Sequence, residues 1–130
     1  ILGVTILTSL NNKSLNDIGY TKSVQQLVLK QARLIKKSGC DGIICSAQEA
    51  KMIRKKFKKL FIVTPGIRLP GDSADDQSRT MTPKDAFKNK VSGIVMGRSL
   101  TRGNIKNNIL RLIYHLNKWS MDLKSVVSQI

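Results

Sequence analysis

Four short apolar runs, each followed by a turn and then by a segment of helical period, constrain the fold of this 130-residue chain more than any other feature. Such alternation is typical of βα units, whose strands lie parallel in one sheet. The apolar runs predict strands over 4–7, 42–45, 60–64 and 91–96. The segments between and after them predict helices over 21–37, from 47 to about 59, from 83 onward, and over 104–117.

Four βα units are half of the eight that close a (β/α)8 barrel, or TIM barrel, of about 250 residues. An open four-stranded parallel sheet is the competing architecture, but it needs cover on both faces and protected edges. The chain also begins inside an apolar run at Ile1, without a Met or a polar lead-in. We therefore expect an α/β fold, half of a TIM barrel cut from something longer, over residues 1–117. Residues 118–130 are expected to form a tail of unknown order.

Local signals place several helix ends and faces. Ser46 followed by Glu49 predicts a capping box, and Thr82 followed by Pro83 predicts a capped helix start. Residues 11–19 are expected to form a polar loop. The positions predicted to be buried are Val24, Leu27, Val28, Leu34 and Ile35 in the first helix and Ile105, Ile109, Leu112, Ile113 and Leu116 in the last.

The chain is strongly basic, with a net charge of +15, and six of the nine positions from 51 to 59 are Lys or Arg. Such charge attracts polyanions without sequence preference. Lysines are spread along the whole chain, however, so we interpret the run as a solvated helix face and expect no nucleic-acid partner. No apolar stretch reaches the roughly 18 residues of a membrane span, so we expect no membrane partner and a cytoplasmic location.

The cysteines and the histidine give no sign of a metal or redox site. The spacing of Cys40 and Cys45 fits no zinc or redox motif, and His115 has no patterned partners. We predict that both cysteines are small apolar core residues.

Polar residues follow the last two predicted strands. In TIM barrels the active site lies where the strands end, and the loops after strands seven and eight commonly form a phosphate site. Gly97 would let backbone N–H groups approach an anion closely, and Arg98 beside it would make charge-assisted bonds to phosphate oxygens. A surface salt bridge is the ordinary alternative for such a pair. If the four units are the last four of a barrel, loops 65–80 and 97–99 become the candidate phosphate site.

A series of short motifs lies at the strand ends and helix starts. They are Leu7-Thr8-Ser9, Asp41-Gly42, Cys45-Ser46-Ala47-Gln48-Glu49-Ala50, Thr64-Pro65-Gly66-Ile67-Arg68, Gly71-Asp72, Asp76-Gln77-Ser78-Arg79, Thr82-Pro83 and Gly97-Arg98-Ser99-Leu100-Thr101. In order and approximate spacing, from residue 2 to 117, they resemble the C-terminal half of the bacterial orotidine 5′-monophosphate (OMP) decarboxylases. The resemblance implies strands five to eight of a TIM barrel.

The resemblance also implies a function. The family converts OMP to uridine 5′-monophosphate (UMP) and carbon dioxide in pyrimidine biosynthesis, without a cofactor and as a homodimer. By position, Thr8 resembles the residue that hydrogen-bonds the pyrimidine, and the residues that resemble the family's phosphate and ribose ligands are Arg68, Gln77, Gly97 and Arg98. The family's catalytic lysines and aspartates lie on strands two and three, so no catalytic residue is expected in this chain. A truncated non-catalytic relic is the main alternative, and a basic polyanion-binding module is the least favoured one.

Three aspartates, Asp72, Asp75 and Asp76, lie in the candidate phosphate loop. Because like charges repel, we expect them to point outward or to pair with Arg68 or Arg79. A metal site built from them is the weaker alternative, because the family that the chain resembles uses no metal.

One segment departs from the family pattern. At Lys90-Val91-Ser92, bacterial relatives tend to have a glycine and an acidic residue before the eighth strand. We expect this departure to affect only a turn.

Overall fold

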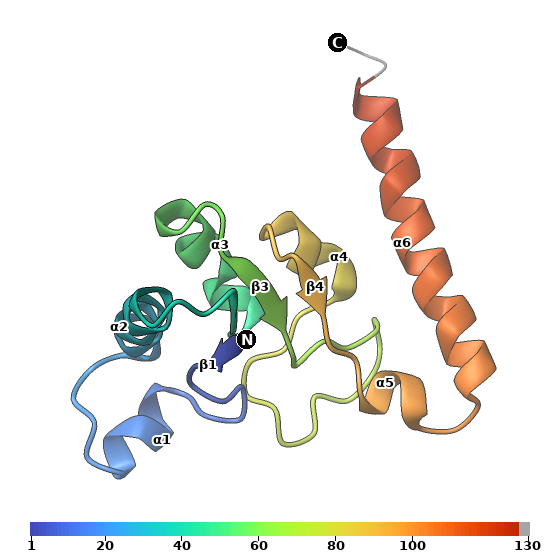
Figure 1. Ribbon diagram of the computed structural model, residues 1–130. Coiled ribbons are helices and arrows are strands. Elements are labelled where there is room, and N and C mark those ends of the chain that lie inside the picture. Colours follow the sequence, from blue (N-terminus) through green and yellow to red (C-terminus); the bar gives the residue numbers. More distant parts are fainter. Residues whose placement is uncertain (128–130) are drawn as a thin grey trace.

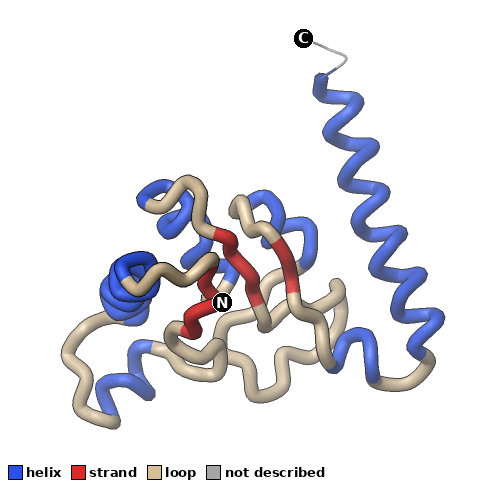
Figure 2. The backbone as a smooth tube through the Cα atoms, in the orientation of Figure 1, coloured by secondary structure: helices blue, strands red, loops and turns tan. Residues whose placement is uncertain are grey.

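A computed structural model describes the backbone of residues 1–127 and the side chains of residues 1–118. Its centre is one parallel sheet in which each strand pairs with the next along the chain, in the order β1-β2-β3-β4 (Figures 1 and 2). The strands are β1 (Leu2–Val4), β2 (Gly42–Ile44), β3 (Phe61–Thr64) and β4 (Gly93–Ile94). The predicted α/β fold with a parallel sheet is confirmed.

The helices of the described chain are α1 (Asn12–Asp17), α2 (Val24–Lys37), α3 (Ala47–Lys56), α4 (Pro83–Lys88), α5 (Arg98–Thr101) and α6 (Ile105–Val127). In Figure 1, α2, α3 and α4 lie along one side of the sheet, and the loops after the strands gather at its carboxyl edge together with α1 and α5. Helix α6 stands at the end of this row, where it contacts α4 and α5. None of the described helices has the length and apolar character that a membrane span needs.

The hydrophobic core lies between the sheet and its helices. Ile43 of β2 and Ile62 of β3 are in register and fully buried, and Ile53 of α3 packs into the same cluster. Full burial of each such side chain contributes about 1.5–3 kcal/mol. Cys45 is also buried, as predicted, whereas Cys40 is only half-buried at the turn before β2.

The second face of the sheet has little cover within the described chain. The side chains of Val4, at the end of β1, and Val95, just after β4, remain 59% and 50% exposed. Both belong to the wall of a pocket described below. The sheet therefore has one face that forms the core and one that borders the pocket.

Two short helices were not predicted. Helix α1 lies in the segment expected to be a polar loop: Asn11 and Ser14 form a capping box at its start, and Leu15 anchors it in the core. A six-residue helix with one buried side chain carries no apolar stripe, so periodicity could not reveal it. Helix α5, at Arg98–Thr101, is shorter still.

Several element boundaries also differ from the prediction. Strand β1 begins earlier than residue 4, β4 is shorter than 91–96, and α3 ends before 59. Thr5 still pairs with the sheet, because its N–H donates to the Ile44 carbonyl at 3.0 Å, and the chain then turns away. The apolar runs overshoot the strands because residues beyond the ends, such as Ile6 and Met96, also pack against the core.

The predicted helix starts are confirmed in part. Ser46 caps α3, and Thr82 caps α4 with Pro83 at the first helical position, as predicted. The predicted capping box of α3 is wrong, because the carboxylate of Glu49 pairs with Arg79 instead.

The predicted buried face of α2 is correct for Val24, Leu27 and Val28. It is wrong for Leu34, which is 56% exposed, and Ile35 is half-buried against the core. Leu34 lies in the last turn, on the solvent side of the helix.

The predicted buried stripe of α6 is largely wrong. Ile105, Ile109 and Ile113 are 53%, 42% and 47% exposed, and Leu112 and Leu116 are half-buried. The helix lies against α4 and α5 along only part of its length, so its apolar face has little to pack on within the described chain. The helix also continues past the predicted end at 117 to Val127, whereas residues 128–130, at the end of the predicted tail, lie outside the described residues.

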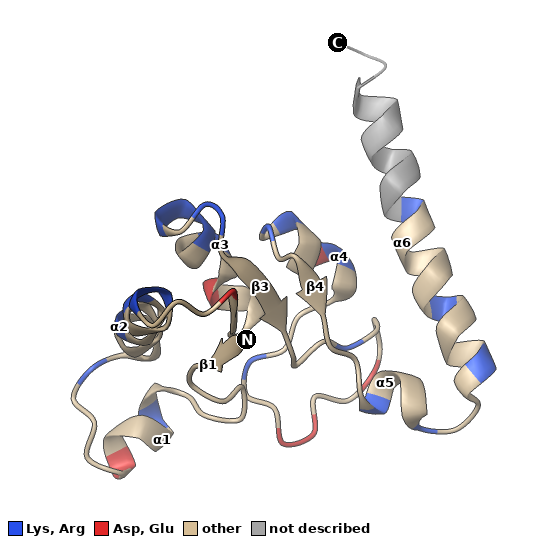
Figure 3. Ribbon diagram, viewed as in Figure 1, with Lys and Arg blue, Asp and Glu red and all other residues tan. Residues whose placement is uncertain are grey.

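The positive charge is concentrated on the helices. Figure 3 shows Lys and Arg on the outer ends of α2, α3 and α4, and acidic residues in the loop at the carboxyl edge of the sheet. The last turns of these helices carry basic residues, which are favourable beside the negative end of the helix dipole. Arg54 has a structural role, because it donates to the carbonyls of Lys58, Leu60 and Lys90 at 2.7–3.1 Å.

Candidate functional site

A pocket of about 450 Å³ opens at the carboxyl ends of the four strands. Segments after β1, β2, β3 and β4 all contribute to its wall. Parallel strands bring residues far apart in sequence to the same edge of the sheet. The pocket therefore unites every residue of the predicted site, namely Thr8, Arg68, Gln77, Gly97 and Arg98.

Thr8 and Gln77 contact each other in the pocket wall. The buried Thr8 hydroxyl donates to Oε1 of Gln77. The Thr8 carbonyl accepts from the backbone N–H groups of Ser78 and Arg79, both at 3.1 Å. The loop after β3 is thus docked on the loop after β1.

Arg68 presents an unused donor. Its side chain is buried, with Nε donating to the Ser73 carbonyl at 3.0 Å and Nη1 to the Ile67 carbonyl at 3.1 Å. Its Nη2 has no hydrogen-bond partner within the described chain. Buried polar groups are normally paired. A free N–H on a buried cation bordering a pocket is suited to an anionic ligand.

Arg98 is occupied by carboxylates of the loop after β3. It follows Gly97 at the start of α5 and forms ion pairs with Asp76 and, at 3.4 Å, with Asp75. Hydrogen bonding to Arg98 holds the pKa of Asp76 below its usual range. An anionic ligand that binds Arg98 would have to displace these carboxylates.

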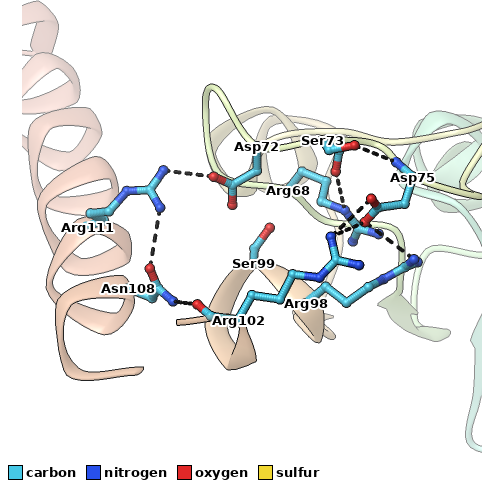
Figure 4. A pocket seen from close by; sticks show the side chains of 9 residues that line it. All are labelled: Arg68, Asp72, Ser73, Asp75, Arg98, Ser99, Arg102, Asn108 and Arg111. Atoms are coloured by element: carbon cyan, nitrogen blue, oxygen red, sulfur yellow. Dashed lines mark hydrogen bonds and ion pairs between the residues drawn. The ribbon is translucent and has the colours of Figure 1, made fainter. Parts of the chain in front are cut away.

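A second hollow, of about 180 Å³, shares Arg68 and Arg98 with the first. Figure 4 shows two further arginines there, with Arg102 bound to Asp75 at 3.0 Å and Arg111 of α6 bound to Asp72 at 2.9 Å.

The three aspartates pair with Arg98, Arg102 and Arg111, so the predicted pairing with Arg68 or Arg79 is wrong. The alternative prediction, that they point outward, holds for Asp76, whose side chain is 64% exposed. Arg102 and Arg111 lie far along the sequence from the loop, so no local pattern indicated them. Within the described residues, no group of three or more His, Cys, Asp or Glu side chains is placed to hold a metal ion.

Residues 1–111 match the family described as orotidine 5′-phosphate decarboxylase / HUMPS. The chain belongs to this family. The OMP decarboxylase of Coxiella burnetii is 46% identical to it over 103 residues, which are 78% of this chain and 44% of that protein. The OMP decarboxylase of Wolbachia sp. subsp. Brugia malayi is 43% identical over 114 residues, or 87% of this chain and 50% of that protein.

Solved structures of the OMP decarboxylase family have the same fold. The enzyme from Lactobacillus acidophilus gives a TM-score of 0.64 at 32% identity and covers 85% of this chain and 48% of its own. The one from Sulfolobus solfataricus gives a TM-score of 0.62 at 15% identity, a likeness of fold alone, and covers 92% and 49%. The chain therefore spans about half the length of the family members it matches.

An ion pair that the sequence did not reveal lies outside the pocket wall. Arg79 Nη1 is 2.6 Å from Oε2 of Glu49, and both side chains are buried. Burial raises the pKa of Glu49, an effect that Arg79 opposes. Both residues stand in the motifs quoted above, but nothing in the sequence between them indicated that they meet.

Proposed function

We propose that the chain supplies the phosphate- and pyrimidine-binding part of an OMP decarboxylase, which converts OMP to UMP and carbon dioxide. The observation that supports this most is the convergence of five residues, from three separate loops, on one pocket. These are the same five positions that the sequence motifs led us to expect as substrate ligands. Chance placement of unrelated polar residues would scatter them over the surface.

We also propose that β1 to β4 are strands five to eight of the barrel, its C-terminal half. In TIM barrels the phosphate site is often built from the loops after strands seven and eight and from a short extra helix. Here the loop after β3 carries Arg68, and the short α5 follows β4 directly. The face of the sheet that borders the pocket would then line the barrel interior.

The chemistry of the pocket fits a nucleoside monophosphate. Arg68 and Arg98 supply two positive charges beside a phosphate dianion, and Gln77 adds an uncharged amide donor. Thr8, in the same wall, offers a hydroxyl for the pyrimidine. On ligand binding, the phosphate would replace Asp76 as the partner of Arg98.

The catalytic step needs groups that this pocket lacks. The described residues of its wall include neither a lysine nor a carboxylate. We therefore propose that the lysines and aspartates that break the carbon–carboxylate bond lie outside this chain, in a complete cytoplasmic homodimer that uses no cofactor. Binding energy gained at the remote phosphate would serve to close and desolvate the site.

Calorimetric titration with UMP tests the proposal on three versions of the chain: native, Arg98→Ala and Arg33→Ala. Arg33 lies exposed on α2, so its substitution removes one positive charge away from the pocket. A hydrogen bond to a charged group contributes about 1.5–3 kcal/mol, so Arg98→Ala should lower the affinity about 10- to 150-fold. The Arg33→Ala chain should bind as the native one does.

Three outcomes would contradict the proposal. A folded native chain that does not bind UMP would indicate a relic, and equal binding by Arg98→Ala would show that the site is assigned wrongly. The chain alone should release no carbon dioxide from OMP, and turnover would show that its own residues complete the reaction.

A further inference from the structure

We propose that Arg79, held by Glu49, is a positioning residue that fixes Thr8 and Gln77 against each other and thereby forms the pyrimidine end of the pocket. The inference rests on the proposed function, because it concerns the same site. In this role the Arg79–Glu49 pair affects ligand affinity although neither residue contacts the ligand.

The side chain of Arg79 is directed at the loop after β1. Its Nη2 donates to the carbonyls of Ile6 and Leu7, both at 2.9 Å, and its Nε donates to the carbonyl of Leu10 at 3.0 Å. These three carbonyls lie on both sides of Thr8 in the sequence. The rigid fork of the guanidinium group therefore fixes the backbone that carries Thr8.

Glu49 ties this fork to the rigid part of the molecule. It lies in the first turn of α3, whose neighbouring residues Ala50 and Ile53 are fully buried in the core. Its carboxylate is 2.6 Å from Arg79 Nη1, so the buried guanidinium charge is neutralised where it lies. Arg79 is thus placed relative to the sheet and not only relative to two loops.

The backbone of the same segment completes the arrangement. The N–H groups of Ser78 and Arg79 donate to the Thr8 carbonyl, and the Ser78 hydroxyl donates to the Ser9 carbonyl at 2.9 Å. Gly66, with a φ of +75°, allows close approach, since a Cβ there would lie 2.9 Å from the Arg79 carbonyl oxygen. Gln77 lies one residue before this docked segment, and its side-chain Oε1 accepts a hydrogen bond from the Thr8 hydroxyl.

Neither Arg79 nor Glu49 lies in the pocket wall. The Arg79 guanidinium is engaged within the protein, because Nε and Nη2 donate to backbone carbonyls and Nη1 lies 2.6 Å from the Glu49 carboxylate. Its influence on binding must pass through Thr8 and Gln77. This separates a positioning role from direct ligation.

A double-mutant cycle on UMP affinity tests this route. Arg79→Gln is combined with Glu49→Gln, because Arg79→Gln alone would leave a buried carboxylate without its partner. The paired substitution and Thr8→Val should each lower UMP affinity about tenfold, and the chain with all three changes should lose little more than either. Losses that multiply to about a hundredfold would overturn the inference, because Arg79 would then act independently of Thr8.

Amide hydrogen exchange gives a second readout that needs no ligand. In the chain that carries both Arg79→Gln and Glu49→Gln, the backbone amides at positions 78 and 79 should exchange at least about tenfold faster, because local opening becomes easier. The amide of Val28, buried in α2, is the internal control and should not change. Unchanged exchange at 78 and 79 would overturn the inference. If the native chain does not bind UMP, the proposed function fails, and exchange alone decides the positioning role.

Discussion

Lys90→Gly should stabilise the chain, because Lys90 is held in the left-handed region with a φ of +65°. For a residue with a Cβ this conformation costs about 1–2 kcal/mol. Glycine avoids that cost but loses about 0.5–1 kcal/mol more in conformational entropy on folding. The turn is held by backbone groups, since the Lys90 N–H donates to the Phe87 carbonyl and the Lys90 carbonyl accepts from Arg54. The expected net gain is therefore about 0.5–1 kcal/mol.

Urea unfolding at 25 °C measures this gain against two controls. Lys90→Ala removes the same charged side chain but keeps the Cβ, so it should gain nothing. Lys88→Gly makes the same substitution two residues earlier, in the last turn of α4, where it should cost up to about 1 kcal/mol. The reasoning is refuted if Lys90→Gly is no more stable than Lys90→Ala.

Three further predictions follow from charge and burial. Asp76→Asn should strengthen UMP binding in calorimetry, because it frees Arg98, and the gain should shrink as salt is added; unchanged affinity would mean that the carboxylate does not compete. Burial raises the pKa of Cys45 to about 12, so Ellman's reagent at pH 8 should quickly modify only Cys40 in the folded chain and both thiols in urea. Fast modification of both thiols in the folded chain would contradict the burial of Cys45. Burial acts to raise the pKa of Asp72, but hydrogen bonds led by the one from Arg111 hold that pKa below its usual value. The ionised Asp72 side chain therefore stabilises the fold above about pH 4, and this stabilisation is lost as the pH falls through the folded-state pKa. Thermal melts from pH 6 to pH 2 should show this loss, and Asp72→Asn should reduce it.

Strand–helix alternation was readable from the sequence because it depends on local periodicity. The starts of α3 and α4 were readable for the same reason, since Ser46 and Thr82 cap helices through neighbours a few residues away. Glu49 shows where such rules stop. Its spacing from Ser46 favoured a capping box, but a guanidinium thirty residues later offered a buried ion pair.

The pocket could be predicted as a set of residues but not as a set of contacts. Family motifs indicated Arg98 and Gln77, and the parallel sheet brought them together. The partners of the loop aspartates depended on where α5 and α6 turn, and α5 gave no periodic signal. For the same reason the exposure of Ile109 was missed, because a helical stripe shows which side is apolar but not whether anything covers it.

The pairing of Arg98 with Asp76 gives the loop after β3 a second property. One guanidinium cannot hold a phosphate and this carboxylate in the same place, so a phosphate bound to Arg98 as proposed would displace Asp76 at the tip of the loop. The position of the loop tip would then report whether the pocket is occupied. A fluorophore attached near the tip would report binding without touching the proposed ligand, and the rate at which the tip returns would measure how fast that ligand leaves.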